Sequence, residues 1–229
     1  PARTASDIFA LPPFHIPAPA GVLGDSPDVP HTLGARSATA PGWPGRTTYR
    51  KEHDTMTDQC RWGIMATGLI ADLFAADLTL AGLPVSAVGS RSAGKADAFA
   101  AKHGIPTAHS SYEDLVADPD VDVIYVATPH PFHVEGAKLA LNAGKHVLIE
   151  KPFAMNAREA REIVALAEAK NLLVMEAMWT RFLPHMVRLR EILSEGTLGE
   201  IHSLWADHSQ ALPDDPNHRL NAMELGGGA

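Results

Sequence analysis

The residues from Arg61 onward predict an α/β fold with a doubly wound parallel sheet. Short apolar runs alternate there with amphipathic stretches of helical spacing, which is the pattern of repeated βαβ units. Each run is apolar almost without interruption, and such runs are typical of strands whose sheet is covered on both faces. We therefore expect one parallel sheet with a layer of helices on each side.

The same alternation assigns the elements in chain order. Apolar runs predict strands over residues 61–65, 84–89, 121–127, 145–149 and 172–175. Helical spacing predicts helices over residues 68–80, 93–103, 112–117, 132–142 and 157–169. A further helix at 180–193 and a strand at 200–207 are expected after the sheet.

Residues 1–55 differ in composition from the rest of the chain. They hold half of the 18 prolines and show no sustained apolar period. Such a segment cannot offset its ordering entropy by burial, so we expect a disordered extension without catalytic residues. Because the chain begins at Pro1 and Met56 stands just before the first expected strand, a translated upstream region is one interpretation. A genuine flexible arm is the other.

Charge and composition exclude several classes of partner. The formal charge is −8 at pH 7, a sign that repels a phosphate backbone, and no basic stripe with interleaved aromatics offsets it, so no nucleic-acid partner is expected. The single cysteine, Cys60, excludes an internal disulfide and favours the reducing cytoplasm. We expect no metal, because no Cys/His spacing typical of zinc sites is present. No run reaches the roughly 18 apolar residues of a membrane span, so no membrane partner is expected.

The first expected strand leads into the first helix through a turn of small residues. Ala66, Gly68 and Ala71 stand at the spacing of a dinucleotide-binding fingerprint, which indicates a Rossmann-type fold. A small central residue lets backbone N–H groups approach a pyrophosphate. Alanine replaces the usual first glycine, so we expect Ala66 to keep a negative φ. Ordinary packing of small residues is the alternative. The segment predicted to bind the cofactor is Ala66, Thr67, Gly68, Leu69 and Ile70.

The end of the second expected strand distinguishes between the two nicotinamide cofactors. An NAD enzyme usually carries Asp or Glu there to accept hydrogen bonds from the ribose, and residues 88–92 contain no carboxylate. Arg91 can make a two-point contact with a 2′-phosphate, and Ser90 or Ser92 can donate to it. The sequence therefore predicts NADP rather than NAD. A solvated surface arginine is the alternative.

Three motifs carry a family resemblance. They are Ala-Thr-Pro-His-Pro-Phe-His at residues 127–133, Glu-Lys-Pro at 150–152, and Met-Glu-Ala-Met-Trp-Thr-Arg-Phe at 175–182. Together they resemble the Gfo/Idh/MocA oxidoreductase family, most closely its branch of dimeric dihydrodiol dehydrogenases and NADP-linked D-xylose dehydrogenases. The resemblance implies an NAD(P)-binding Rossmann domain over 56–179 and the incomplete start of an α+β substrate and dimerisation domain over 180–229. The implied reaction is NADP-dependent hydride transfer to or from a hydroxyl or carbonyl carbon of a sugar or diol.

Lys151 is the catalytic residue that the resemblance implies. It directly follows an apolar strand, so it is expected at the carboxyl edge of the sheet, where open α/β folds bind ligands. An ammonium group there can stabilise a developing alkoxide and carry the hydroxyl proton. In the family the Lys-Pro bond is commonly cis. An exposed lysine that only closes a strand is the alternative.

The resemblance also implies further contacts around this lysine. His133 could instead be a plain histidine at a helix start, Trp179 could be ordinary interdomain core, and the role of Glu176 is open. The remaining expected cofactor contacts are Thr128, Pro129, His130, His133, Glu150, Lys151, Trp179 and Arg181. The expected substrate contacts are Lys151, Trp179 and Arg219.

The glycine run at residues 226–228 leads, in the family, into a helix that carries a second acid/base group. We therefore expect a fragment of a longer enzyme, inactive alone, with an unpaired apolar edge near Ile201. The complete protein is expected to be a cytoplasmic homo-oligomer. A non-catalytic NADP-binding sensor is the alternative function. A short-chain dehydrogenase is disfavoured, because no Tyr-x-x-x-Lys pair lies on an expected helix.

Overall fold

The computed structural model describes residues 60–207, 209, 211, 213–218 and 220–226. The extension expected over residues 1–55 and the substrate contact expected at Arg219 lie outside the described residues. The domain boundary expected near residue 180 stays a prediction.

Six parallel strands form one sheet in the order β3-β2-β1-β4-β5-β6. They are β1 Trp62–Met65, β2 Val85–Gly89, β3 Thr107–His109, β4 Val123–Val126, β5 His146–Ile149 and β6 Val174–Glu176. The expected α/β class with a parallel sheet is confirmed. The strand order reverses between β1 and β4, and open α/β sheets bind ligands outside the carboxyl ends of strands at such a point.

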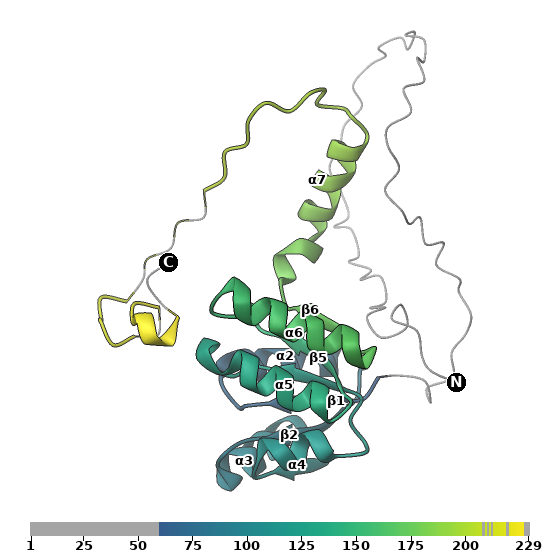
Figure 1. Cartoon of the computed structure of the whole chain (residues 1–229), viewed down its shortest axis with the longest axis vertical. Helices are drawn as coiled ribbons and strands as arrows, with labels where there is room; N and C mark the ends of the chain where they lie inside the picture. The colour runs from purple at the N-terminus through teal and green to yellow at the C-terminus, as the bar shows by residue number, and fades with distance from the viewer. Residues whose placement is uncertain (1–59, 208, 210, 212, 219, 227–229) are drawn as a thin grey trace, which may run out of the picture. The chain divides into compact units, whose positions relative to one another are not determined.

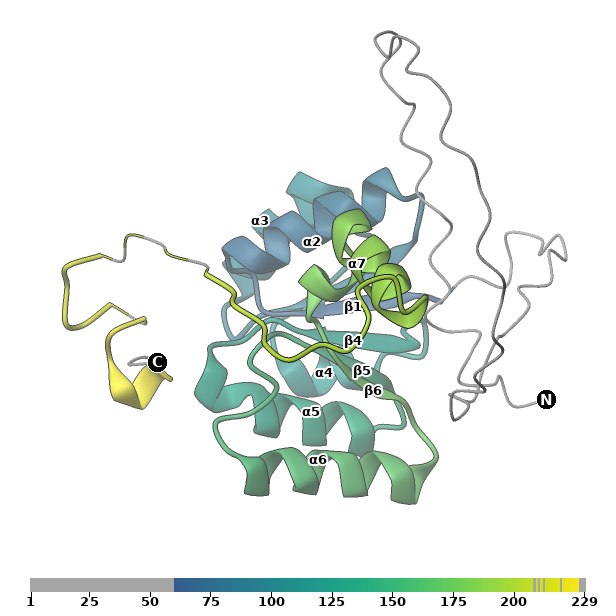
Figure 2. The same ribbon diagram turned by 90° about the horizontal axis from the view of Figure 1, so that it is seen from above.

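Helices cover both faces of the sheet. They are α2 Leu69–Leu80, α3 Ala93–His103, α4 Tyr112–Ala117, α5 His133–Asn142 and α6 Ala157–Lys170. A further helix, α7 Pro184–Ser194, comes after β6 and has no buried residue. Figures 1 and 2 show α2 and α3 on one face and α4, α5 and α6 on the other. Local caps fix two of the starts: Ser111 Oγ accepts from Asp114 N at 3.0 Å before α4, and Asn156 Oδ1 accepts from Glu159 N at 3.1 Å before α6. No helix in the described part has both the length and the apolarity to cross a bilayer.

Helix α5 approaches the two central strands closely through Gly136. A methyl group on Gly136 would meet Met65 Sδ at 2.8 Å and Val126 Cγ1 at 3.1 Å. Both strands are buried along their whole length, so their side chains have little room to move away. Because Met65 ends β1, the same close approach shapes the carboxyl edge of the sheet.

Of two expectations for the residues after β6, one is confirmed apart from its start and one is wrong. The helix expected at 180–193 is present as α7, Pro184–Ser194, but it begins four residues later, after a 3₁₀ turn, η3 at Trp179–Phe182, because Pro184 has no N–H to donate and takes the first position of a new helix. The strand expected at 200–207 is absent: residues 201–207 have no regular structure, and Trp205 is 93% exposed. A strand needs a neighbour for its backbone groups, and the described sheet ends at β6.

Replacing Gly136 with alanine should destabilise the protein, because the added methyl group has no room against Met65 and Val126. We expect the free energy of unfolding to fall by about 1–3 kcal/mol, as in other overpacked cores. Gly94 on α3 is the matched control: a methyl group there meets nothing within 4 Å, and alanine is favoured over glycine in a helix by about 1 kcal/mol. Urea unfolding followed by circular dichroism measures both variants. Equal stability of the two would contradict the close approach.

Candidate active site

The turn between β1 and α2 leaves the start of the helix open. Gly68 is the N-cap of α2 and forms no side-chain cap. A methyl group on Gly68 would meet nothing within 4 Å, and Leu69, the first helical residue, is 78% exposed. Open space before an uncapped helix N-terminus is the arrangement that binds phosphate groups.

Ala66 has a conformation that the sequence does not predict. The expected negative φ is wrong, because φ is +86°. Ala66 N donates to Gly89 O at 2.9 Å, which extends the pairing of β1 with β2 by one residue before the chain turns into α2. The turn therefore has the conformation for which glycine is usual, and the alanine methyl group costs about 1–2 kcal/mol there.

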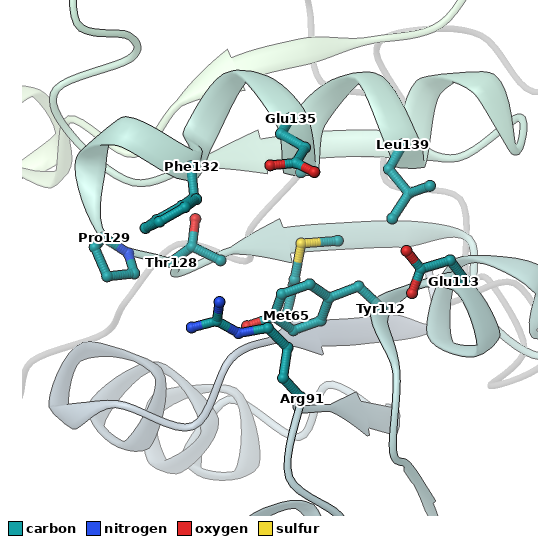
Figure 3. A pocket seen from close by; sticks show the side chains of 10 residues that line it. Met65, Arg91, Tyr112, Glu113, Thr128, Pro129, Phe132, Glu135 and Leu139 are labelled. Carbon is teal, nitrogen blue, oxygen red and sulfur yellow. The ribbon is translucent and has the colours of Figure 1, made fainter.

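A pocket of about 270 Å³ lies at the carboxyl ends of β1 and β4 (Figure 3). Its walls come from β1, the β2–α3 loop, α4 and the segment from β4 into α5. The lining residues are Met65, Arg91, Tyr112, Glu113, Thr128, Pro129, Phe132, Glu135, Gly136 and Leu139. Three expected cofactor contacts, Arg91, Thr128 and Pro129, thus line one cavity.

The pocket combines a cation, aromatic rings and an unpaired hydroxyl. The Arg91 guanidinium carbon lies 5.6 Å from the centroid of the Phe132 ring. Burial raises the pKa of Tyr112, and the neighbouring Arg91 opposes that rise. Thr128 is 7% exposed, and its Oγ1 has no hydrogen-bond partner among the described residues. Because a buried polar atom without a partner is costly, a ligand that bonds to Thr128 would be favoured.

Ser90 supports the loop that carries Arg91. Its N–H donates to His109 O at 3.1 Å, and its buried Oγ accepts from Ser92 N at 3.3 Å. Arg91 itself is exposed. The serine therefore fixes the loop, and the arginine is the residue that faces the pocket (Figure 3).

The turn after β5 carries Lys151, and we name residues 150–153 the lysine turn. The Lys151–Pro152 peptide bond is cis, as the resemblance implies. Lys151 is exposed and forms no ion pair within the described part of the chain. Glu150 is buried instead, and its carboxylate accepts from the Tyr125 hydroxyl at 2.5 Å and from Lys151 N at 3.1 Å. The carboxylate expected to contact the cofactor is thus bound to the protein itself.

His133 also differs from its expected role. Its ring is fully buried, with Nδ1 2.8 Å from Pro152 O and Nε2 2.9 Å from Thr128 O. A ring with no exposed surface cannot contact a ribose, so His133 joins the lysine turn to the β4–α5 loop rather than lining the ligand. His130 lies beside it, with the ring centroids 5.5 Å apart.

Other expected site residues are not brought to the pocket. Trp179 is 58% exposed on η3, and Arg181 on the same turn is exposed. Their cofactor and substrate contacts stay predictions. The sequence analysis missed the lining residues Phe132 and Tyr112, for which the only local signal is an aromatic residue at the start of a helix. It also missed Tyr125, a phenol in an otherwise apolar strand, which is a signal that a buried partner exists.

A doubly wound sheet with an open helix start and a pocket at its reversal point is typical of a dinucleotide-binding domain. Comparison with known proteins gives the family. Residues 60–178 match the oxidoreductase family with an NAD-binding Rossmann fold, Gfo/Idh/MocA, and the chain belongs to that family. The resemblance drawn from the three motifs is therefore confirmed.

Curated relatives cover the same region. The trans-1,2-dihydrobenzene-1,2-diol dehydrogenase of Bos taurus is 46% identical over 157 residues, which are 66% of this chain and 46% of that protein. Its namesake in Homo sapiens is 46% identical over 172 residues, 73% of this chain and 51% of that protein. The chain spans about half the length of the curated relatives it matches. Among solved structures, a 3-ketoreductase from Actinomadura kijaniata in complex with NADP has a TM-score of 0.57 and 33% identity, covering 62% of this chain and 46% of that one.

Replacing Ala66 with glycine should stabilise the protein. Relief of the positive φ contributes about 1–2 kcal/mol, and the greater freedom of glycine in the unfolded chain removes about 0.5–1 kcal/mol of that. We expect a net gain of about 0.5–1 kcal/mol in the free energy of unfolding. Ala76, exposed within α2, is the control, since glycine in a helix costs about 1 kcal/mol. Guanidinium unfolding compares the two, and a loss in both variants would show that Ala66 is unstrained.

Proposed function

We propose that the protein is an NADP-dependent oxidoreductase that transfers a hydride between the nicotinamide and a hydroxyl or carbonyl carbon of a sugar or diol. The observation that carries this proposal is the pocket at the reversal point of the sheet, with Arg91 on its wall and the buried Thr128 hydroxyl left without a partner. A pocket of this kind fits a cofactor that brings both negative charge and hydrogen-bonding groups.

The residues present fit the parts of the cofactor. The open N–H groups at the start of α2 suit the pyrophosphate, and the forked guanidinium of Arg91 suits a 2′-phosphate. The ring of Phe132 and the flat face of Arg91 suit a purine. Glu113 and Glu135 line the same pocket and oppose a phosphate there, so the proposal of NADP depends on Arg91 outweighing them locally.

Lys151 has the position and charge required of a proton-transfer group. Bound NADP or NADPH supplies the hydride chemistry. The lysine ammonium, exposed at the carboxyl edge and without an ion pair in the described residues, can stabilise an alkoxide on the substrate and exchange a proton with it. Glu150 does not neutralise it by a direct pair, because that carboxylate is bound to Tyr125 and to a backbone N–H.

The names of the relatives support the substrate class. The curated relatives are named trans-1,2-dihydrobenzene-1,2-diol dehydrogenases, and the structural relative is a 3-ketoreductase solved with NADP. We extend to this protein a small diol or sugar as substrate, a homo-oligomeric state, a cytoplasmic location, and no nucleic-acid or membrane partner. A non-catalytic NADP-binding sensor is the second candidate, and Lys151 argues against it, since a pure binder does not require an ammonium at that position.

Replacing Arg91 with alanine should weaken NADPH binding selectively. Charge-assisted bonds to one phosphate contribute roughly 1.5–3 kcal/mol, so we expect the Kd for NADPH to rise about 10–100-fold. The Kd for NADH should change no more than about threefold, because NADH lacks the 2′-phosphate. Arg161→Ala, on the exposed side of α6, is the matched control. Isothermal titration measures the Kd of each cofactor for the unsubstituted chain and for both variants. Equal losses for both cofactors would refute the 2′-phosphate contact, and absence of binding by the unsubstituted chain would refute the function.

Replacing Lys151 with methionine should abolish turnover and leave cofactor binding intact. Loss of a general acid and alkoxide stabiliser costs about 10²–10⁴-fold in kcat, while the Kd for NADPH should stay within about threefold because the cation does not contact the phosphates in this proposal. Lys170→Met, at the end of α6, is the control. In the complete enzyme, NADPH oxidation is followed with panels of aldehydes and ketones, and NADP reduction with diols and aldoses. Tight NADPH binding without turnover on any of them would favour the sensor.

A further inference from the structure

The lysine turn is held from both sides by side chains to which the proposed function assigns no role. Strand β5 lies between β4 and β6, and the turn leaves its carboxyl end. Tyr125 on β4 supports the start of the turn through Glu150, and Glu176 at the end of β6 supports its last residue. Two neighbouring strands therefore each contribute one contact.

Tyr125 is a buried phenol in an apolar strand. It is 1% exposed, and its ring stacks on Phe74 of α2 with the centroids 3.9 Å apart. Its hydroxyl donates to Glu150 Oε1 at 2.5 Å. Burial raises the pKa of Tyr125 far above its usual value, and the Glu150 carboxylate raises it further, so the hydroxyl remains a donor. The stacking fixes the ring, and the ring fixes the carboxylate.

Glu150 connects the fixed Tyr125 ring to the backbone of Lys151. Its second oxygen accepts from Lys151 N at 3.1 Å, so one carboxylate joins the Tyr125 hydroxyl to the amide of the proposed catalytic residue. Both oxygens are used by the protein. The carboxylate therefore orients the Lys151 backbone and leaves the Lys151 side chain unpaired among the described residues.

Glu176 constrains the other end of the turn. It is the last residue of β6, directly opposite Ile149 in the parallel register, and Ala177 N donates to Ile149 O at 2.7 Å. Its Oε1 accepts from Phe153 N at 2.8 Å. The carboxylate thus connects a fixed strand end to the residue that closes the turn, two residues after Lys151.

We propose that Tyr125 and Glu176 are positioning residues for Lys151: through Glu150 and Phe153 N they hold the lysine turn in the orientation needed for proton transfer. This inference rests on the proposed role of Lys151. Neither side chain touches the lysine side chain or the pocket. Their effect should therefore appear in the chemical step and leave cofactor affinity unchanged.

Variants of Glu176 separate hydrogen bonding from simple packing. Glu176→Ala removes the acceptor for Phe153 N, and Glu176→Gln keeps an oxygen acceptor of the same length. Since misplacement of a reacting group by about 1 Å can cost about 100-fold, we expect kcat, measured on the complete enzyme, to fall about 10–100-fold in Glu176→Ala and in Tyr125→Phe. Glu176→Gln should stay within about threefold of the unsubstituted protein, as should Glu162→Gln, a partly exposed carboxylate on α6 that pairs with Lys138 and lies outside the lysine turn. In every variant the Kd and KM for NADPH should change less than about twofold.

The exchange rates of the backbone amides of the lysine turn can be measured without catalysis. They therefore separate failure of this inference from failure of the proposed function. The Phe153 amide should exchange faster in Glu176→Ala and the Lys151 amide faster in Tyr125→Phe, with the amides of β5 unchanged and Glu176→Gln protected like the original. Unchanged exchange at both amides overturns the inference, even in a chain that binds NADPH and converts no substrate. So does a kcat unaffected by Glu176→Ala and Tyr125→Phe, a Glu176→Gln variant as slow as Glu176→Ala, or a loss of NADPH binding that parallels the loss of kcat.

Discussion

A polar group removed from water must find a partner, and this requirement determines how the carboxyl edge of the sheet is built. Glu150 is buried against Tyr125, and His133 is buried between two backbone carbonyls. Glu150 joins the lysine turn to strand β4, and His133 joins that turn to the β4–α5 loop, so a shift of the turn would leave a buried group unpaired at a cost of about 1–3 kcal/mol. The Thr128 hydroxyl differs, because it is buried and unpaired within the described residues. In a hydrophobic core such a hydroxyl would have a partner. Fixed loops around the unpaired Thr128 hydroxyl are therefore typical of a binding site.

Most of the fold follows from local patterns, because caps and apolar runs act within a few residues. The departures depend on distant partners. Strand β3, Thr107–His109, is short and half-buried, so no apolar run predicts it, and it forms because β2 offers an edge for pairing. Strand β6 begins two residues later than expected, because Leu172 N still donates to Ala167 O at the end of α6. Residues 200–207 have the composition of a strand and no neighbour in the described sheet.

The candidate site is predictable where it depends on strand ends. Arg91 and Lys151 come shortly after strands, so chain order alone brings both to one edge of the sheet. The hydrogen-bond partners of the supporting side chains cannot be predicted in this way. The sequence shows that the phenol of Tyr125 needs a buried partner. Only the register of β4 against β5, with Tyr125 opposite Leu148, shows that this partner is Glu150. The burial of His133 likewise depends on how α5 packs beside the lysine turn.

Because the protein is acidic, recognition of the proposed cofactor depends on the groups in direct contact with it rather than on the net charge. The chain carries a formal charge of −8, and the cofactor is an anion, so the field of the whole protein opposes its approach. That field is screened beyond about 8 Å at physiological ionic strength, and the donors in contact with the ligand then decide affinity. Glu150 and Glu176 accept from the backbone N–H groups of Lys151 and Phe153 rather than from the Lys151 ammonium group. Because these two carboxylates are held by backbone N–H groups, neither forms an ion pair with the Lys151 ammonium. An acidic protein can therefore present this ammonium group to the proposed anionic ligand.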